Sequence, residues 1–218
     1  MSNANDPFER YEMIGPPLKV RGSMILKEEV RADTIDVVGH LSAQNNVTTA
    51  KLKVSGDCSI GGHCRAEQVI NLGGLRVQHI QADRLQSSGY FSAAQDAAVK
   101  TFYAEGAVKI HRLTAESSIE LRLGNRSTID VIKSSGTITV KPSMKLMNAL
   151  IPYFRKLTCK TIEGTSIMLY RTTADLVYGE DIVIGPGCSI GEVRYSKSLT
   201  VDPKSQVART VFLNKLQT

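Results

Sequence analysis

Hydrophobic residues in the first half of the chain follow two periods at once. Within short stretches they alternate with polar residues, as in the segment LKVRGSMIL that begins at Leu18. This alternation is typical of β-strands whose alternate side chains face a core. On a longer scale a glycine recurs after 17, 17, 17, 16 and 17 positions. The glycines that mark this repeat are Gly22, Gly39, Gly56, Gly73, Gly89 and Gly106.

Aligning the repeats on these glycines produces columns of apolar residues. The column four positions before the glycine contains only apolar side chains, from Leu18 to Phe102. A repeat of this length has too few apolar residues for a core of its own, so it needs a neighbour stacked at about 4.8 Å to cover them. The sequence therefore predicts an all-β fold, a parallel β-helix with three short strands in each turn of about 17 residues.

The shorter repeats indicate where the turns have corners. They lose their residue in a polar stretch, where GGH and AQD alternate with the shorter QH and HR. A corner tolerates a deletion, whereas a strand would lose its alternation. The repeated glycine predicts a second corner, at which a positive φ or closely stacked backbones leave no room for a side chain.

The stretch GDCSIGGHCRA at residues 56–66 has the composition of a zinc site but not the required register. Cys58 and Cys64 fall in inward columns, whereas His63 falls on a corner that faces water. We therefore interpret both cysteines as core residues and predict no metal site here. His79 occupies the same corner position one turn later, which makes a surface pair of histidines conceivable.

The repeat loosens after the sixth turn, and we divide the chain accordingly. Residues 1–17 are expected to form a flexible tail, 18–141 six regular turns and one irregular turn of the β-helix, 142–157 a short amphipathic helix or linker, and 158–218 a C-terminal β-rich segment. Within the linker, PSMKLMNALIPYFRKL predicts a short helix around 143–151, since apolar residues recur with helical spacing. Packing on the solenoid is one use of this helix, and contact with a membrane or a partner is the alternative. The contact residues in that case are Met144, Lys145, Met147, Ile151 and Phe154.

The segment IVIGPGCSIG resembles the hexapeptide repeat of left-handed β-helix acyltransferases, but it covers less than two repeats. Such an enzyme needs a histidine as general base, and the last histidine of this chain is His111. We find no phosphate loop or catalytic triad spacing either. The sequence thus favours a protein that is not an enzyme and that has no cofactor and no small-molecule substrate.

Composition and charge narrow the class of protein further. No apolar run approaches the roughly 20 residues of a membrane helix, and residues 1–20 lack the pattern of a secretory signal. We expect a cytoplasmic protein, with contact at the inner face of the membrane as an open alternative. The net charge of +6 is concentrated in residues 118–157, which have 7 basic and 2 acidic side chains. Because the chain has no Trp and only 6% aromatic residues, we do not expect a nucleic-acid partner.

The order of these parts resembles the bactofilins, the polymer-forming cytoskeletal proteins of bacteria. The likeness covers the glycine-marked turns of residues 18–117, the segment KLTCKTIEG, and the tail ADLVYGEDIVIGPGCSIGEVRYSKSLTVD. The tail is similar to the C-terminal extension of the longer Gram-positive members. The resemblance implies a right-handed β-helix that assembles end to end without nucleotide and serves as a scaffold in cell shape, envelope synthesis or motility. It also implies a paralogous bactofilin as a further candidate partner.

The first turn is the expected surface for self-association. It presents unpaired backbone groups and an apolar cross-section, with only the polar residues 1–17 available to cover it. We therefore expect a homo-oligomer, either a dimer or a filament, formed through the ends of the β-helix. The residues expected at the N-terminal end are Leu18, Val20, Met24, Leu26 and Val30. The alternative is a monomeric binding module that uses the basic region 118–157 to hold a membrane surface or another anionic partner.

Overall fold

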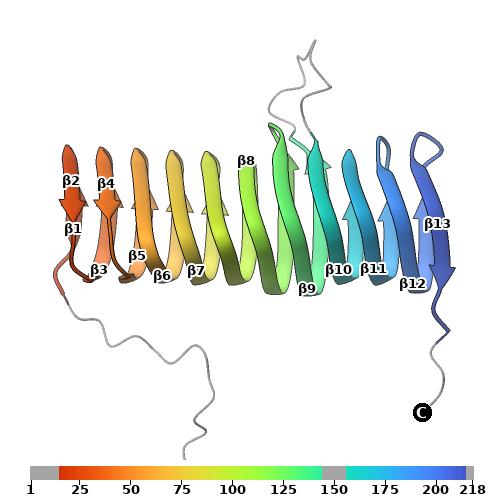
Figure 1. Cartoon of the computed structure of the whole chain (residues 1–218), viewed down its shortest axis with the longest axis horizontal. Coiled ribbons are helices and arrows are strands. Elements are labelled where there is room, and N and C mark those ends of the chain that lie inside the picture. Colours follow the sequence, from red (N-terminus) through yellow and green to blue (C-terminus); the bar gives the residue numbers. More distant parts are fainter. Residues whose placement is uncertain (1–14, 144–155, 215–218) are drawn as a thin grey trace, which may run out of the picture.

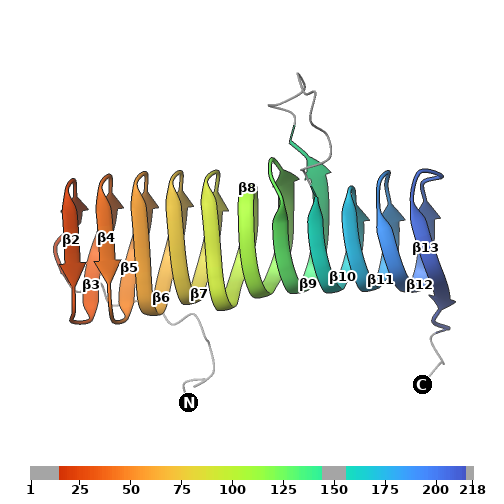
Figure 2. The same cartoon turned by 45° about the horizontal axis from the view of Figure 1, so that its top comes forward.

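The computed structural model describes residues 15–143 and 156–214 of the 218-residue chain. All regular secondary structure in these residues is β-strand, and the strands pair in parallel in a single 13-stranded sheet. The sheet winds into a rod-shaped solenoid, with the first turn at one end of the rod and β13 at the other (Figure 1). The turned view in Figure 2 shows the same regular stack. The predicted parallel β-helix is thereby confirmed.

The strands become longer toward the middle of the rod, because the pairing there continues around corners. The first turn contains separate short strands, whereas β8 extends through 34 residues without a break. The strands are β1 (Leu18–Val20), β2 (Ser23–Leu26), β3 (Val30–Val37), β4 (His40–Ala43), β5 (Val47–Val54), β6 (Asp57–Asn71), β7 (Gly74–Ser87), β8 (Tyr90–Leu123), β9 (Ser127–Pro142), β10 (Leu157–Leu169), β11 (Thr172–Ile184), β12 (Ser189–Val201) and β13 (Gln206–Phe212).

The pairing follows the columns that the sequence repeat predicts. Leu18 pairs with Ile35, Ile35 with Leu52, and Leu52 with Val69. Cys58 pairs with Leu41 in the turn before it, and each of the two side chains is only 1% exposed. The cysteine therefore belongs to the core, as its inward column indicates.

The register between turns shifts at the corner where the sequence predicts that deletions are tolerated. The register between β6 and β7 shifts between Ile60 and His63, and that between β7 and β8 shifts between Val77 and Ile80. In both cases the strands before and after the corner keep their alternation of buried and exposed side chains. A missing residue at the corner changes the length of the loop and leaves the core-facing positions intact.

The C-terminal strands do not form a separate unit, because they continue the same stack. β10 pairs in parallel with β9, and β11, β12 and β13 follow in order. Residues 158–218, which the sequence analysis set apart, thus provide the last turns of the solenoid as far as Asn214. β9 and β10 thus pair directly although residues 144–155, which are not described, lie between them in the sequence.

Most of the predicted helix around 143–151 lies outside the described residues. Pro142, directly before the predicted helix, is the last residue of β9 and pairs with Leu123 in β8. Proline lacks an N–H donor, so the end of a strand is a position that it can occupy.

One continuous hydrophobic cluster fills the rod from Val20 to Val193. Its largest fully buried side chains are Phe91 and Phe102, whose ring centroids lie 6.0 Å apart. Small buried residues, Ala93, Ala97 and Ala104, occupy other inward positions close to them in sequence. Alternating large and small side chains in this way keeps the cross-section filled and the turn spacing constant.

Candidate functional site: the open ends of the solenoid

The N-terminal end of the rod presents strand edges without a partner. β1 pairs only with β3, and β2 pairs only with β4. Within residues 15–143 and 156–214 no strand lies against the other edge of either. The chain enters the stack just before them, where the carbonyl oxygen of Gly15 accepts a hydrogen bond of 3.3 Å from the backbone N–H of Asp33. An edge of this kind can pair with a further strand.

The five residues predicted for this end differ in how far they are exposed. Val20 is 2% exposed and belongs to the core. The other four, Leu18, Met24, Leu26 and Val30, are partly buried and pack against that core. Ile25, which the sequence analysis did not select, is 66% exposed on the outer side of β2. The end of the rod is therefore an apolar cross-section that is only half covered.

The repeated glycines lie above one another at one corner of the rod. At Gly39, Gly56, Gly73 and Gly89 an added Cβ atom would collide with a backbone carbonyl oxygen of the turn before. At Gly106 an added Cβ atom would likewise collide with the carbonyl oxygen of Gly89, and Gly106 also has a positive φ of 152°. Gly22 differs from all of these, because a Cβ atom there would meet nothing within 4 Å. No described residue therefore occupies the position beyond Gly22, whereas a backbone carbonyl of the preceding turn occupies it at Gly39, Gly56, Gly73, Gly89 and Gly106.

The C-terminal end is also open, and it is aromatic. Among the described residues β13 pairs only with β12, and this pairing ends where Phe212 meets Tyr195. The two rings lie 5.3 Å apart, and Phe212 remains 55% exposed. Leu199 and Val207, also in the last two strands, are partly buried and pack against the core. The last turns therefore extend the solenoid and leave a second apolar surface at its far end.

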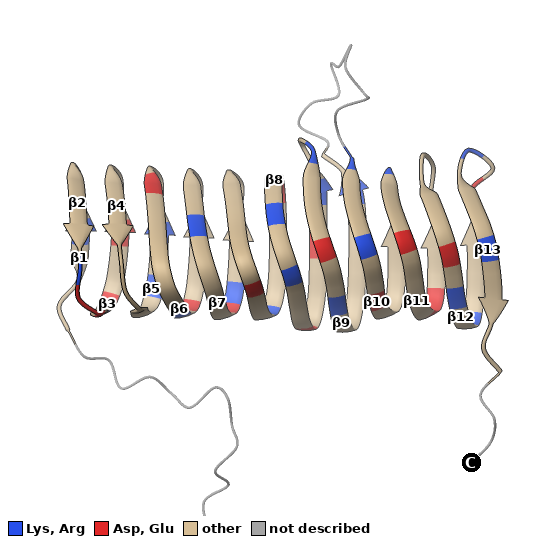
Figure 3. Ribbon diagram, viewed as in Figure 1, with Lys and Arg blue, Asp and Glu red and all other residues tan. Residues whose placement is uncertain are grey.

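The basic region 118–157 is less distinct in the structure than in the sequence. In Figure 3, ribbon positions of Lys and Arg (blue) and of Asp and Glu (red) are interspersed along the length of the rod. Arg122 lies 2.9 Å from Glu120, and Lys133 lies 2.7 Å from Glu163 in the next turn. At these two described positions an acidic side chain therefore neutralises part of the positive charge of the segment.

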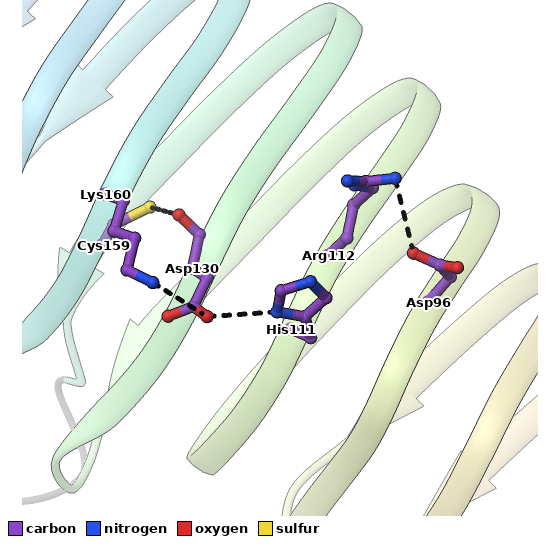
Figure 4. A network of polar contacts seen from close by, with 6 residues as sticks. All are labelled: Asp96, His111, Arg112, Asp130, Cys159 and Lys160. Atoms are coloured by element: carbon purple, nitrogen blue, oxygen red, sulfur yellow. Dashed lines mark hydrogen bonds and ion pairs between the residues drawn. The ribbon is translucent and has the colours of Figure 1, made fainter.

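Asp130 is the centre of a small network of polar contacts (Figure 4). Its Oδ2 atom lies 3.1 Å from Nδ1 of His111 and 3.4 Å from Nζ of Lys160. The hydrogen bond with His111, followed by the charge of Lys160, lowers the pKa of the Asp130 carboxyl group below its ordinary value of 3.8. The carboxylate is therefore ionised at neutral pH and links three consecutive turns.

The cysteines of the chain are all buried and free. Burial raises the pKa of Cys58 to about 12 and that of Cys159 to about 12, and it also raises the pKa of Cys64 and Cys188. The thiolate is the reactive form of cysteine, so these side chains are unreactive as nucleophiles at neutral pH.

The helix face proposed for a membrane or a partner cannot be placed. Met144, Lys145, Met147, Ile151 and Phe154 all lie outside the described residues. In the described part of the chain, no helix is long and apolar enough to cross a membrane.

Comparison with known proteins yields two relatives of unknown role. The chain is 37% identical over 93 residues to "Uncharacterized protein YhbF" of Bacillus subtilis (strain 168), a match that covers 42% of this chain and 38% of that protein. It is 39% identical over 70 residues to "Uncharacterized protein YhbE" of the same organism, with 32% and 29% covered. The matches thus span less than half of either relative. No protein-family model matches the chain, and no solved structure matches it.

Proposed function

We propose that this chain is a structural protein that associates with itself through the ends of its solenoid. A β-solenoid is compatible with a structural or scaffold role. The observation that carries the proposal is the position beyond Gly22, which no described residue occupies. Each later glycine of this row is covered by the carbonyl oxygen of the turn before it, whereas no described residue covers Gly22, and a second molecule would supply that cover.

The half-covered side chains of the first turn support the same proposal. Leu18, Met24 and Leu26 pack on the core from one side only, and β1 and β2 each have one unpaired edge. A docked end would cover the apolar side chains and supply main-chain hydrogen bonds to the edge strands. Contact between two identical N-terminal ends closes into a dimer, whereas contact between opposite ends propagates a fibre.

We further propose that the assembled chain serves as an intracellular scaffold of the bactofilin kind. The resemblance of the turns and of the C-terminal tail supports this role. Shape, envelope and motility processes are the candidates, and a related solenoid with an equally open end is a candidate partner.

Gly22→Arg is a sharper test of the N-terminal interface than a charge on the core. Val20 is buried, so a charge there would disturb the fold itself, whereas Gly22 faces open space. We expect the wild-type chain to sediment as a species larger than a monomer and the Gly22→Arg variant to shift to a smaller species. Leu72→Arg is the matched control, because Leu72 is exposed midway along the rod and its substitution should leave sedimentation unchanged.

Phe212→Arg at the other end distinguishes the possible arrangements. If only N-terminal ends join, Gly22→Arg yields monomers and Phe212→Arg has no effect. If opposite ends join, either variant alone yields monomers. If N-terminal ends join each other and C-terminal ends also join each other, each single variant leaves dimers and the double variant yields monomers. A wild-type chain that stays monomeric, or assemblies that none of these variants changes, would overturn the proposal.

A further inference from the structure

His63 and His79 stack on each other at a corner of the rod. They are register partners in β6 and β7, their ring centroids lie 4.6 Å apart, and their ring planes differ by 13°. Both line a groove on the surface of the solenoid, together with Asn46 and Asp96. The surface pair that the sequence register made conceivable is thus present, with the two imidazoles side by side.

The turns around this corner hold His63 in position. The Oδ1 atom of Asn46, one turn earlier, accepts a hydrogen bond of 2.9 Å from the backbone N–H of His63. A Cβ atom on Gly62 would collide with the same Oδ1 atom, so glycine is needed beside the histidine. The stretch GGH therefore serves a geometric purpose, which is to let the Asn46 side chain reach the backbone of the next turn.

Asp96 lies on the other side of His79. Its Oδ2 atom is 3.7 Å from Nδ1 of His79, and its Oδ1 atom is 3.9 Å from Nη1 of Arg112, as Figure 4 shows for the second contact. A histidine that binds a metal commonly donates its other ring N–H to a carboxylate, which fixes the tautomer and the orientation of the ring. With Nδ1 facing Asp96, Nε2 of His79 remains as the nitrogen that can bind a cation.

We propose that His63 and His79 bind a divalent transition-metal cation, such as Zn²⁺, and that Asp96 positions His79. Imidazole nitrogen suits Zn²⁺, Cu²⁺ and Ni²⁺, with a metal–nitrogen distance of about 2.0–2.1 Å for zinc. Two nitrogens of neighbouring rings must then approach to within about 4 Å, which a tilt of two surface side chains achieves. Among the described residues no group of three or more His, Cys, Asp or Glu side chains could hold a metal. Water therefore completes the coordination.

The experiment is a calorimetric titration of the full chain with Zn²⁺ in a buffer that does not chelate metals. We expect one Zn²⁺ per chain and a loss of affinity of at least tenfold in His63→Gln and in His79→Gln. The chain has 4 histidines, and the other two provide matched controls, since His40→Gln and His111→Gln should bind as the wild type does. Circular dichroism of each variant checks that the fold is intact.

The role of Asp96 has its own pair of variants. Asp96→Asn should weaken Zn²⁺ binding about 10- to 100-fold, the usual effect of removing such a partner. Asp96→Glu, which keeps a carboxylate, should recover most of the affinity. Equal affinity in Asp96→Asn and the wild type would refute the positioning role.

Three results would overturn the site itself. These are the absence of saturable binding by the wild type, undiminished binding by the double variant His63→Gln/His79→Gln, and an equal loss of affinity in His40→Gln or His111→Gln. A stoichiometry of one Zn²⁺ per two chains would also overturn it, because the metal would then bridge two copies. None of these readouts depends on whether the ends of the solenoid associate.

Discussion

The carbonyl oxygen of Gly22 occupies the space that a Cβ atom on Gly39 would need, so the two glycines stack backbone against backbone. The same relationship recurs in the following turns at this corner. The row of stacked glycines from Gly22 to Gly106 therefore follows from the spacing between turns. Backbones that lie about 4.8 Å apart leave no room for a side chain that points along the axis of the rod.

This geometry predicts opposite results for two identical substitutions. Gly39→Ala should destabilise the fold by about 1–3 kcal/mol, since the added methyl group must displace backbone atoms of the turn before. In the dissociated chain, Gly22→Ala should change the free energy of unfolding by no more than about 0.5 kcal/mol, since within one chain its Cβ atom meets no described residue. Urea unfolding of the two variants at equal protein concentration measures both values. Similar losses at the two positions would contradict the stacking argument.

The core predicts an equally large contrast between two phenylalanines. Phe91 is fully buried, and Phe91→Ala should cost about 3–5 kcal/mol because it leaves a cavity in the core. Phe212 is largely exposed and contacts Tyr195, so Phe212→Ala should cost only about 1 kcal/mol. Thermal unfolding provides the comparison. A small effect at Phe91 would mean that the turns collapse around the cavity.

The cysteines should be inert in the folded chain. Because burial raises the pKa of Cys58 and Cys159 to about 12, the thiol form prevails at pH 8, where Ellman's reagent is normally used. We expect no rapid reaction in the native protein and reaction of all 4 cysteines in guanidinium chloride. Rapid modification of one thiol under native conditions would show that its turn opens readily.

The Asp130 network predicts a dependence of stability on pH. Its carboxyl pKa is lowered in the folded chain, first by the hydrogen bond with His111 and then by Lys160, despite an opposing contribution from burial. The folded state therefore binds this proton less readily than the unfolded state. The stabilisation is fully present above the ordinary pKa of 3.8 and is lost as pH falls through the lower, folded value.

Urea midpoints of the wild type and Asp130→Asn between pH 2 and pH 7 measure this contribution. The wild type should be the more stable chain near neutral pH, and the difference should vanish at the acid end. In a His111→Gln background the difference should shrink, because the largest cause of the shift is gone. A constant difference at every pH would show that ionisation of Asp130 plays no part.

The sequence alone determined the repeating unit and the direction of its side chains. The spacing from Gly22 to Gly106 implied stacked turns, and the alternation around Cys58 and Cys64 placed both thiols in the core. These features are local, since a period of two along a strand and a constant length per turn can be read from neighbouring residues. The same register also placed His63 beside His79.

Only the tertiary structure decided what lies against each turn once the repeat is broken. Ile129 pairs with Cys159, and the insertion between them has a length that no periodicity dictates. The hydrogen bonds between parallel strands depend on which segments meet in space, and a loop of any length can connect them. The environment of Gly22 is decided in the same way, since among the described residues no strand stacks on its turn, although the glycine itself repeats in the turns that follow.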